Sequence, residues 1–245
     1  MATANRGVSR KLHRALRPIA DGIWQLRGLP DHAVNAYFAD GILFDCRTRW
    51  AATSIGRQLR ERTVSVIALT HAHPDHWGAA PALCTRFGVR LAVHEADRGI
   101  VTGDERAGGH VAFRLGKQFL EGGVCREVVS LKEGDAVGDF TVVHAPGHSA
   151  GHVVYFRESD GVAVTGDLFS TMDTWSRRRR LAEPPAHLSV DAAENRRSIL
   201  KLAELRPSMV LPGHGPVLED MRMLERLAEQ LAEQTVTEKV GSAVA

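Results

Sequence analysis

Four candidate metal ligands lie within six residues of this chain, directly after a nearly continuous apolar segment. The segment, residues 64–69, is rich in β-branched side chains and predicts a strand buried on both faces. The side chains that follow it are His71, His73, Asp75 and His76. Polar groups this dense are costly to bury at the end of a core strand unless ions satisfy them. The sequence therefore predicts a metal site at this strand end.

The spacing within this motif predicts two neighbouring metal positions. His71 and His73 are two residues apart in an extended segment, so their side chains project on the same side. Pro74 enforces a turn, after which Asp75 and His76 point toward a second position nearby. Imidazole and carboxylate together suit zinc best, and iron or manganese are the alternatives.

Three later segments repeat one pattern, an apolar strand that runs into a tight turn displaying a single ligand. The segments and their ligands are 141–145 with His148, 162–165 with Asp167, and 209–211 with His214. A glycine directly precedes each ligand and lets the backbone turn sharply. Strand ends that each place one functional side chain are how a sheet assembles a rigid site from distant parts of a sequence. We therefore expect all of these side chains to share one centre.

Outside these motifs the chain alternates short apolar strands with amphipathic helices. Further strands are predicted at 22–26, 36–44, 91–93, 127–130 and 153–156. Helices are predicted at 53–60, at 79–87, around 113–120, from the capping box Asp191-x-x-Glu194 to Leu205, and from Met221 onward.

No linker divides the chain, and the parts 19–125 and 126–214 each run from strands to a helix. We therefore predict a basic N-terminal extension, residues 1–18, and a single α/β domain, residues 19–245. The domain is expected to consist of two similar halves, with sheets in the middle and helices outside.

The composition excludes several classes of protein. With 44% apolar and 24% charged side chains in 245 residues, the chain has the proportions of a globular protein and not of a disordered one. A formal charge of +2 gives no field that would attract nucleic acid. No apolar run has the length of a membrane span, and the three cysteines form no CxxC motif. We therefore expect a cytoplasmic protein with reduced thiols and a small-molecule substrate, and no nucleic-acid or membrane partner.

Taken in order, the motif His71-x-His73-x-Asp75-His76 and the later His148, Asp167 and His214 resemble the metallo-β-lactamase superfamily of dinuclear metallohydrolases. The resemblance runs from Ile23 to His214 and includes Asn35-Ala-Tyr37. It implies a four-layer αββα sandwich. It also implies three sets of ligands: His71, His73 and His148 for a first metal; Asp75, His76 and His214 for a second; and Asp167 as the bridge between them.

The same resemblance implies a hydrolase that holds two divalent ions, zinc first, and attacks its substrate with a hydroxide bridging them. A metal-bound water ionises near pH 7, which makes such a nucleophile available. The expected substrate is a small ester, thioester, lactone or related compound. Asp75, at the edge of the second metal, is the candidate for steering the nucleophile or passing its proton.

Three further residues are candidates for orienting the ligands. Asp45 either orients a ligand histidine or belongs to a surface turn, because the glycine usual for the family is absent from Phe44-Asp45-Cys46-Arg47. His144 and His152 flank the loop of His148, as donors to the ligands or as histidines at the edge of the core.

Two other functions remain open at this point. Sulfur dioxygenases resemble the same scaffold but use one iron held by two histidines and an aspartate, which would be His71, His148 and Asp167. The third hypothesis is a non-catalytic protein that uses the scaffold only for binding. The presence of all seven candidate ligands argues against it. The N-terminal extension and the apolar stripe of the last helix are candidate contacts of a homodimer.

Overall fold

The computed structural model describes residues 16–104, 120–173 and 178–243, the last nine of these as backbone alone. Its larger sheet has seven strands that follow one another in chain order: β1 (Leu16–Ala20), β2 (Ile23–Leu26), β3 (Tyr37–Ala39), β4 (Ile42–Phe44), β5 (Val66–Ala68), β6 (Leu91–His94) and β7 (Val128–Leu131). Neighbours from β1 to β4 are antiparallel, and neighbours from β4 to β7 are parallel.

A second sheet of five strands has the order β14-β11-β10-β9-β8: β8 (Ala136–Val137), β9 (Phe140–His144), β10 (Val153–Arg157), β11 (Val162–Gly166) and β14 (Met209–Pro212). Only β11 and β14 are parallel to each other. A separate hairpin, β12 (Ser170–Met172) with β13 (Arg179–Ala182), follows β11.

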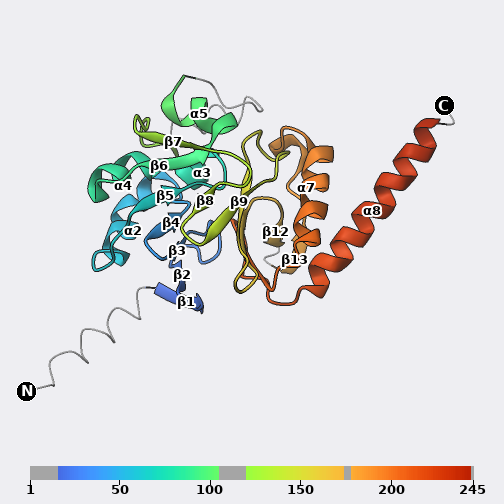
Figure 1. Cartoon of the computed structure of the whole chain (residues 1–245), viewed down its shortest axis with the longest axis horizontal. Helices are drawn as coiled ribbons and strands as arrows, with labels where there is room; N and C mark the ends of the chain where they lie inside the picture. Colours follow the sequence, from blue (N-terminus) through green and yellow to red (C-terminus); the bar gives the residue numbers. More distant parts are fainter. Residues whose placement is uncertain (1–15, 105–119, 174–177, 244–245) are drawn as a thin grey trace, which may run out of the picture.

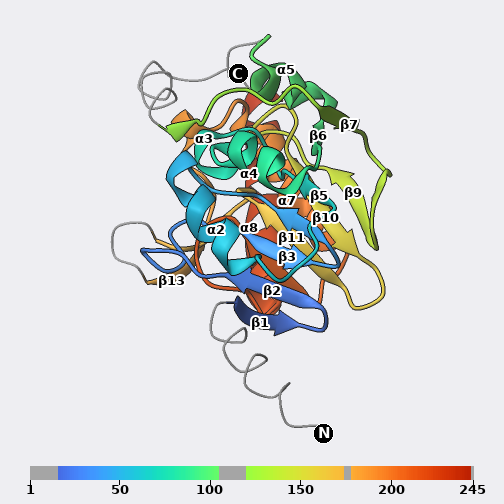
Figure 2. The same cartoon turned by 90° about the vertical axis from the view of Figure 1, so that its left-hand side faces the viewer.

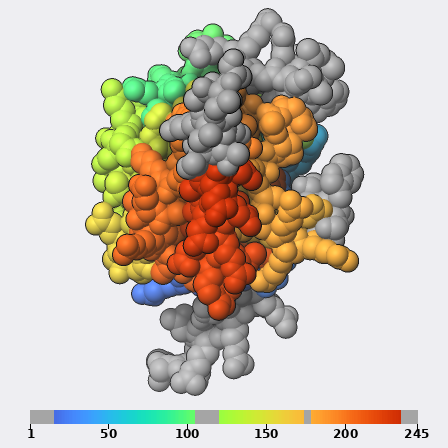
Figure 3. Space-filling view, turned by 90° about the vertical axis from the view of Figure 1, so that its right-hand side faces the viewer, coloured from blue at the N-terminus to red at the C-terminus, as the bar shows by residue number. Residues whose placement is uncertain are grey.

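The described helices are α2 (Ala52–Gln58), α3 (Pro74–Trp77), α4 (Ala80–Phe87), α5 (Arg98–Thr102), α7 (Ala192–Glu204) and α8 (Arg222–Ala243). The helices α2 and α4 cover the outer face of the first sheet, and α7 and α8 that of the second. Short 3₁₀ turns are η1 (Arg49–Ala51), η2 (Glu95–Asp97) and η3 (Ala186–Leu188). Figure 1 shows α2 and α4 on one side and α7 and α8 on the other. Figure 2 looks onto α2, α3 and α4, and Figure 3 onto α8 where it lies beside α7. The predicted αββα sandwich is confirmed.

Three buried apolar clusters fill the spaces between these four layers. One joins the first sheet to α2 and α4, and another joins the second sheet to α7 and α8. The third lies between the sheets, where the ring of Phe44 packs against Phe140 (ring centres 4.8 Å apart) and Tyr155 (5.0 Å). Contact between these aromatic rings joins β4 of one sheet to β9 and β10 of the other.

Several element boundaries differ from those expected. The strand expected at 36–44 is two strands, because Asp40 and Gly41 turn the chain with φ of 49° and 85°. The expected N-terminal extension ends inside β1, whose residues 16–18 pair with β2. The expected boundary between the halves at 125/126 precedes β7, which still belongs to the first sheet. The helix expected around 113–120 lies almost wholly outside the described residues.

The start of α7 follows the predicted cap. The side chain of Asp191 accepts a hydrogen bond from the backbone N of Glu194 at 2.9 Å. The backbone N of Asp191 donates to Gly147 O (2.9 Å), so this helix end is also tied to the loop before His148. A side chain at Gly147 is excluded there, because a Cβ would lie 2.1 Å from the backbone N of Asn195.

Among the described residues, no helix combines the length and the apolar character that crossing a membrane requires.

Phe44 tests the packing between the sheets. Phe44→Ala removes a fully buried ring, and we expect the free energy of unfolding to fall by about 3–5 kcal/mol, because a cavity replaces its contacts. Urea denaturation followed by circular dichroism measures the loss. Trp50→Ala, at a site 60% exposed, is the control and should change stability by less than about 0.5 kcal/mol. Similar losses in both variants would contradict this role of Phe44.

Candidate metal centre

The first ligand motif begins where β5 ends and continues into α3. His73 has extended backbone geometry and caps α3, and Pro74 occupies its first turn. Proline suits this position because its fixed φ is helical and its missing N–H would have no partner in the helix. The turn places Asp75 and His76 on α3, beside His71 on the extended segment.

The other three ligands project from the second sheet. His148 lies in the connection from β9 to β10, Asp167 follows β11, and His214 follows β14. Because β11 and β14 are parallel neighbours, their carboxyl ends lie at the same edge of the sheet. Two hydrogen bonds join this edge to the end of β5: Val153 N to Thr70 O (2.8 Å) and the Tyr155 hydroxyl to Leu69 O (2.7 Å). The strand ends of both sheets therefore meet.

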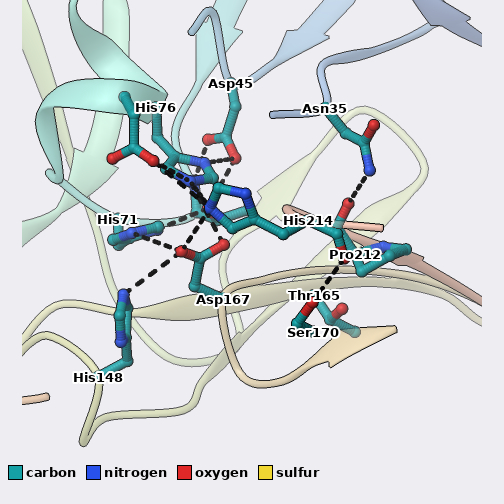
Figure 4. Close-up of polar contacts among 12 residues, drawn as sticks. Asn35, Asp45, His71, His76, His148, Thr165, Asp167, Ser170, Pro212 and His214 are labelled. Atoms are coloured by element: carbon teal, nitrogen blue, oxygen red, sulfur yellow. Dashed lines mark hydrogen bonds and ion pairs between the residues drawn. The ribbon is translucent and has the colours of Figure 1, made fainter. Parts of the chain in front are cut away.

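The side chains of all seven predicted ligands come together at this edge. They form three overlapping groups whose ligand atoms lie within 4.8 Å of one another: His71, His73 and His148; His71, His76 and Asp167; and Asp75, His76 and His214. Figure 4 shows His71, His76, His148 and His214 turned toward the carboxylate of Asp167. These groups match the two ligand sets and the bridge that the sequence resemblance implies. Their role as ligands remains a prediction.

Asp167 lies at the centre of the cluster. Its Oδ2 is 3.1 Å from His214 Nε2, 3.5 Å from His148 Nε2 and 3.9 Å from His71 Nε2. Its Oδ1 is 3.3 Å from His76 Nε2. One carboxylate thus contacts imidazoles of both predicted ligand sets, as a bridging ligand must.

Four of the five histidines present Nε2 toward the centre, and their Nδ1 atoms have other partners. His76 Nδ1 donates to Asp45 (2.9 Å), and His71 Nδ1 donates to the Thr70 hydroxyl (3.0 Å). Two more rings are held in the same way, His148 Nδ1 by the Ser189 hydroxyl (3.4 Å) and His214 Nδ1 by Ala33 O. A metal-binding histidine commonly donates its other ring N–H to such a partner, which fixes its tautomer and orientation.

Two of the inward nitrogens have no hydrogen-bond partner among the described residues: His71 Nε2 and His148 Nε2, both of them buried. An unpaired buried polar atom is costly, and a metal ion would satisfy it. The residues present therefore fit a pair of divalent ions, with imidazole and carboxylate donors of the kind zinc and iron accept.

Burial and charge divide the histidines into two kinds. Burial lowers the pKa of His71, His73 and His148, so these rings are neutral and ready to donate a lone pair. Burial opposes protonation of His76 and His214 too, but the carboxylates of Asp167 and Asp75 outweigh it. They raise the pKa of His214 to about 10 and also raise the pKa of His76. Without metal, these two rings carry the compensating positive charge.

Asp45 contacts a candidate ligand directly. Its Oδ2 accepts from His76 Nδ1 and from the Thr70 hydroxyl (2.8 Å), and its Oδ1 accepts from Thr70 N (2.8 Å). The side chain is buried, so a simple surface turn is excluded. A φ of 55° puts Asp45 in the left-handed region, which aspartate and asparagine tolerate best among residues with side chains.

The two flanking histidines act on the backbone of the ligand loops. His152 Nε2 accepts a hydrogen bond from the backbone N of Asp167 at 3.1 Å. His144 Nε2 donates to Ala150 O (3.0 Å), and its ring stacks on His94 with centres 4.0 Å apart. Both histidines therefore contact the segments that carry predicted ligands. Their hydrogen bonds in the described structure go to the backbone of these segments and not to the side chains of the predicted ligands.

Two residues that support the predicted ligands have no role assigned from the sequence: Asn35, which belongs to the motif Asn35-Ala-Tyr37, and Asp97. Asn35 Nδ2 donates to Pro212 O (2.8 Å) and Gly215 O (2.7 Å), and so holds the turn that carries His214. Asp97 accepts hydrogen bonds from both loops that carry His71 and His148. Its one sequence signal is its place after β6, the parallel neighbour of the strand that precedes the first motif.

The fold and this site define a class: a mixed α/β sandwich with a candidate metal centre of histidine and aspartate where the strand ends of its two sheets meet. The family model of the metallo-β-lactamase superfamily matches residues 29–214. The chain belongs to this superfamily, and metal-dependent hydrolysis is the activity associated with it at the family level.

Individual proteins agree with this assignment. The probable metallo-hydrolase YflN of Bacillus subtilis is 29% identical over 222 residues, which cover 78% of this chain and 83% of YflN. The crystal structure of a β-lactamase domain protein from Burkholderia ambifaria has a TM-score of 0.68 at 26% identity, over 94% of this chain and 80% of that one. The structure of TTHA1623 in a di-iron-bound form has a TM-score of 0.58 at 26% identity, over 76% and 89%.

Asp45→Asn tests whether the Asp45 carboxylate orients His76. Asparagine tolerates the left-handed backbone but lacks the second acceptor oxygen and the charge, so we expect zinc affinity to fall about 10–100-fold. Competition with a chromophoric chelator measures the affinity. Asp40→Asn is the matched control, because Asp40 also has a positive φ (49°) but faces solvent beside Arg157. Equal affinities in the two variants would remove this role.

Proposed function

We propose that this protein is a hydrolase that binds two divalent ions, zinc in the first instance, and cleaves a small ester, thioester, lactone or related compound. The observation that carries the proposal is the convergence of two histidine groups on the single carboxylate of Asp167. Such a carboxylate suits a bridge between neighbouring ions. When bound, the ions would polarise a substrate oxygen and lower the pKa of a coordinated water to about 7. Iron, the metal in the di-iron-bound form of TTHA1623, is the alternative.

The exposure of the ligands indicates the side from which a substrate would approach. The side chains of His71 and His76 are fully buried, whereas Asp75 and His214 are 29% and 30% exposed. Substrate would therefore meet the Asp75 side of the centre. Leu188 and Val190 are also exposed, and Val190 N donates to His148 O, which places apolar side chains next to a ligand loop. This supports a substrate with an apolar part.

Asp75 is the residue we assign to proton transfer. Its Oδ2 lies 3.4 Å from His214 Nε2 and 3.6 Å from His76 Nε2, and its side chain reaches solvent. Burial alone would raise the pKa of this carboxyl group, but His76 and His214 outweigh it and lower the pKa. The group is thus an anion at neutral pH, able to accept a hydrogen bond from an attacking water and to pass its proton outward.

Metal content and turnover test the proposed function together. We expect elemental analysis to find two zinc-like ions per chain, and a panel of chromogenic esters, thioesters, lactones and phosphodiesters to include a substrate. A chelator should abolish turnover, and added zinc should restore it. One iron per chain with oxygen consumption on a persulfide would instead establish the dioxygenase, and a metal-loaded protein without turnover would favour a binding role.

Asp75→Asn tests the proton-transfer role. We expect kcat to fall by at least about a hundredfold, because the amide cannot accept the proton. Elemental analysis of the same variant must still find both ions, so that the loss is one of proton transfer and not of metal. Near-normal turnover with both ions bound would show that Asp75 serves only as a ligand.

A further inference from the structure

Asp97 is a buried carboxylate outside the seven predicted ligands. It lies at the end of η2, three residues after β6, and the residue is 1% exposed. Because β6 is parallel to β5, the carboxyl ends of these strands share an edge of the first sheet. Asp97 therefore lies beside the segment that carries His71 and His73.

The Asp97 carboxylate accepts three hydrogen bonds from two separate loops. Its Oδ2 accepts from Ala72 N (2.9 Å), and Ala72 stands between two predicted ligands. The same oxygen accepts from the Ser149 hydroxyl (2.8 Å), and Oδ1 accepts from Gly151 N (2.8 Å). Ser149 directly follows His148. One side chain thus joins the two segments that supply the His71, His73 and His148 group.

The backbone at Gly151 is fitted to this carboxylate. A Cβ at Gly151 would lie 2.6 Å from Asp97 Cγ and 2.7 Å from Asp97 N and Oδ1. These are closer than real Cβ contacts allow, so the loop approaches Asp97 as closely as it does only because position 151 has no side chain. This close packing fixes the position of the loop relative to the Asp97 carboxylate.

Asp45 makes the corresponding contacts for the other ligand set. It accepts from His76 Nδ1 and also from Thr70, the residue before His71. Asp97 accepts its hydrogen bonds from Ala72, Ser149 and Gly151, in the segments of His71, His73 and His148. Of these two buried carboxylates, Asp45 is the one that accepts from a ring of the second set, and Asp97 is the one that joins the two segments of the first set.

We propose that Asp97 is a positioning residue that sets the metal affinity of the His71, His73 and His148 group, and leaves that of the Asp75, His76 and His214 group unchanged. This inference rests on the proposed function only in requiring that both groups bind metal. Asp97→Asn keeps the volume of the side chain but has one acceptor oxygen in place of two. In either amide orientation, the NH₂ group faces a backbone N–H, that of Ala72 or that of Gly151, so the hydrogen bond to one of the two loops at that N–H is lost.

The test measures zinc affinity in proteins that keep one ligand group each. His214→Ala weakens the Asp75, His76 and His214 group. The more tightly bound zinc ion of this variant therefore reports on the His71, His73 and His148 group. His148→Ala does the reverse. Adding Asp97→Asn should lower zinc affinity at least about tenfold in the His214→Ala protein, within the usual range for residues that orient ligands. In the His148→Ala protein the change should stay below about twofold.

Two further variants separate positioning from general loss of stability. Asp160→Asn removes a carboxylate that pairs with Arg157 (2.6 Å) in the turn from β10 to β11, at the other end of the second sheet. It should lower the melting temperature without changing zinc affinity. Ser149→Ala removes one of the three hydrogen bonds but keeps the charge, and should weaken zinc binding less, again only in the His214→Ala protein. It keeps the test valid if Asp97→Asn does not fold.

The outcomes distinguish this inference from the proposed function. Equal losses of zinc affinity in both backgrounds, or no loss in either, would overturn the role of Asp97 alone. Selective loss in a protein that turns over no substrate would support Asp97 and contradict the hydrolase. A wild-type protein that binds no zinc, cobalt or iron would overturn both.

Discussion

The buried carboxylate of Asp167 is the interaction on which the rest of this centre depends. Its oxygens lie 3.1–3.9 Å from imidazoles of three chain segments that are distant in sequence. A buried negative charge is costly unless hydrogen bonds or positive charge compensate it. Without metal, protons on His76 and His214 supply that charge; divalent ions would replace those protons. Metal uptake at this centre would therefore be coupled to proton release.

The scaffold supplies this centre from the ends of strands and orients it through buried hydrogen bonds. Parallel pairs, β5 with β6 and β11 with β14, place their carboxyl ends at common edges. The ligand rings are then fixed through Nδ1, and the backbone of the loops through carboxylates and His152. Hydrogen bonds of this kind keep lone pairs aimed at one point before any ion arrives, which lowers the cost of binding one.

The sequence predicts the side chains that converge at this centre far better than the residues that hold them in place. Histidines that directly follow an apolar strand are recognisable, because their residue type and their spacing together indicate a metal site. Asp97 carries no such signal, since its partners are two backbone N–H groups and a serine 52 residues away, and only the fold brings them together. The division of residues 36–44 was missed for a local reason: the turn consists of Asp40 and Gly41 between apolar residues that read as one continuous strand.

The bonds from Val153 N to Thr70 O and from the Tyr155 hydroxyl to Leu69 O are among the hydrogen bonds that join the two sheets across their apolar interface. Because the ligands come from both sides of this junction, ions held there would act as a cross-link between the halves of the molecule. Folding and metal binding would then be thermodynamically coupled, because a metal ion that binds only the folded chain stabilises the folded state by mass action. A cell short of the metal would hold less of the folded protein as well as less of the active one.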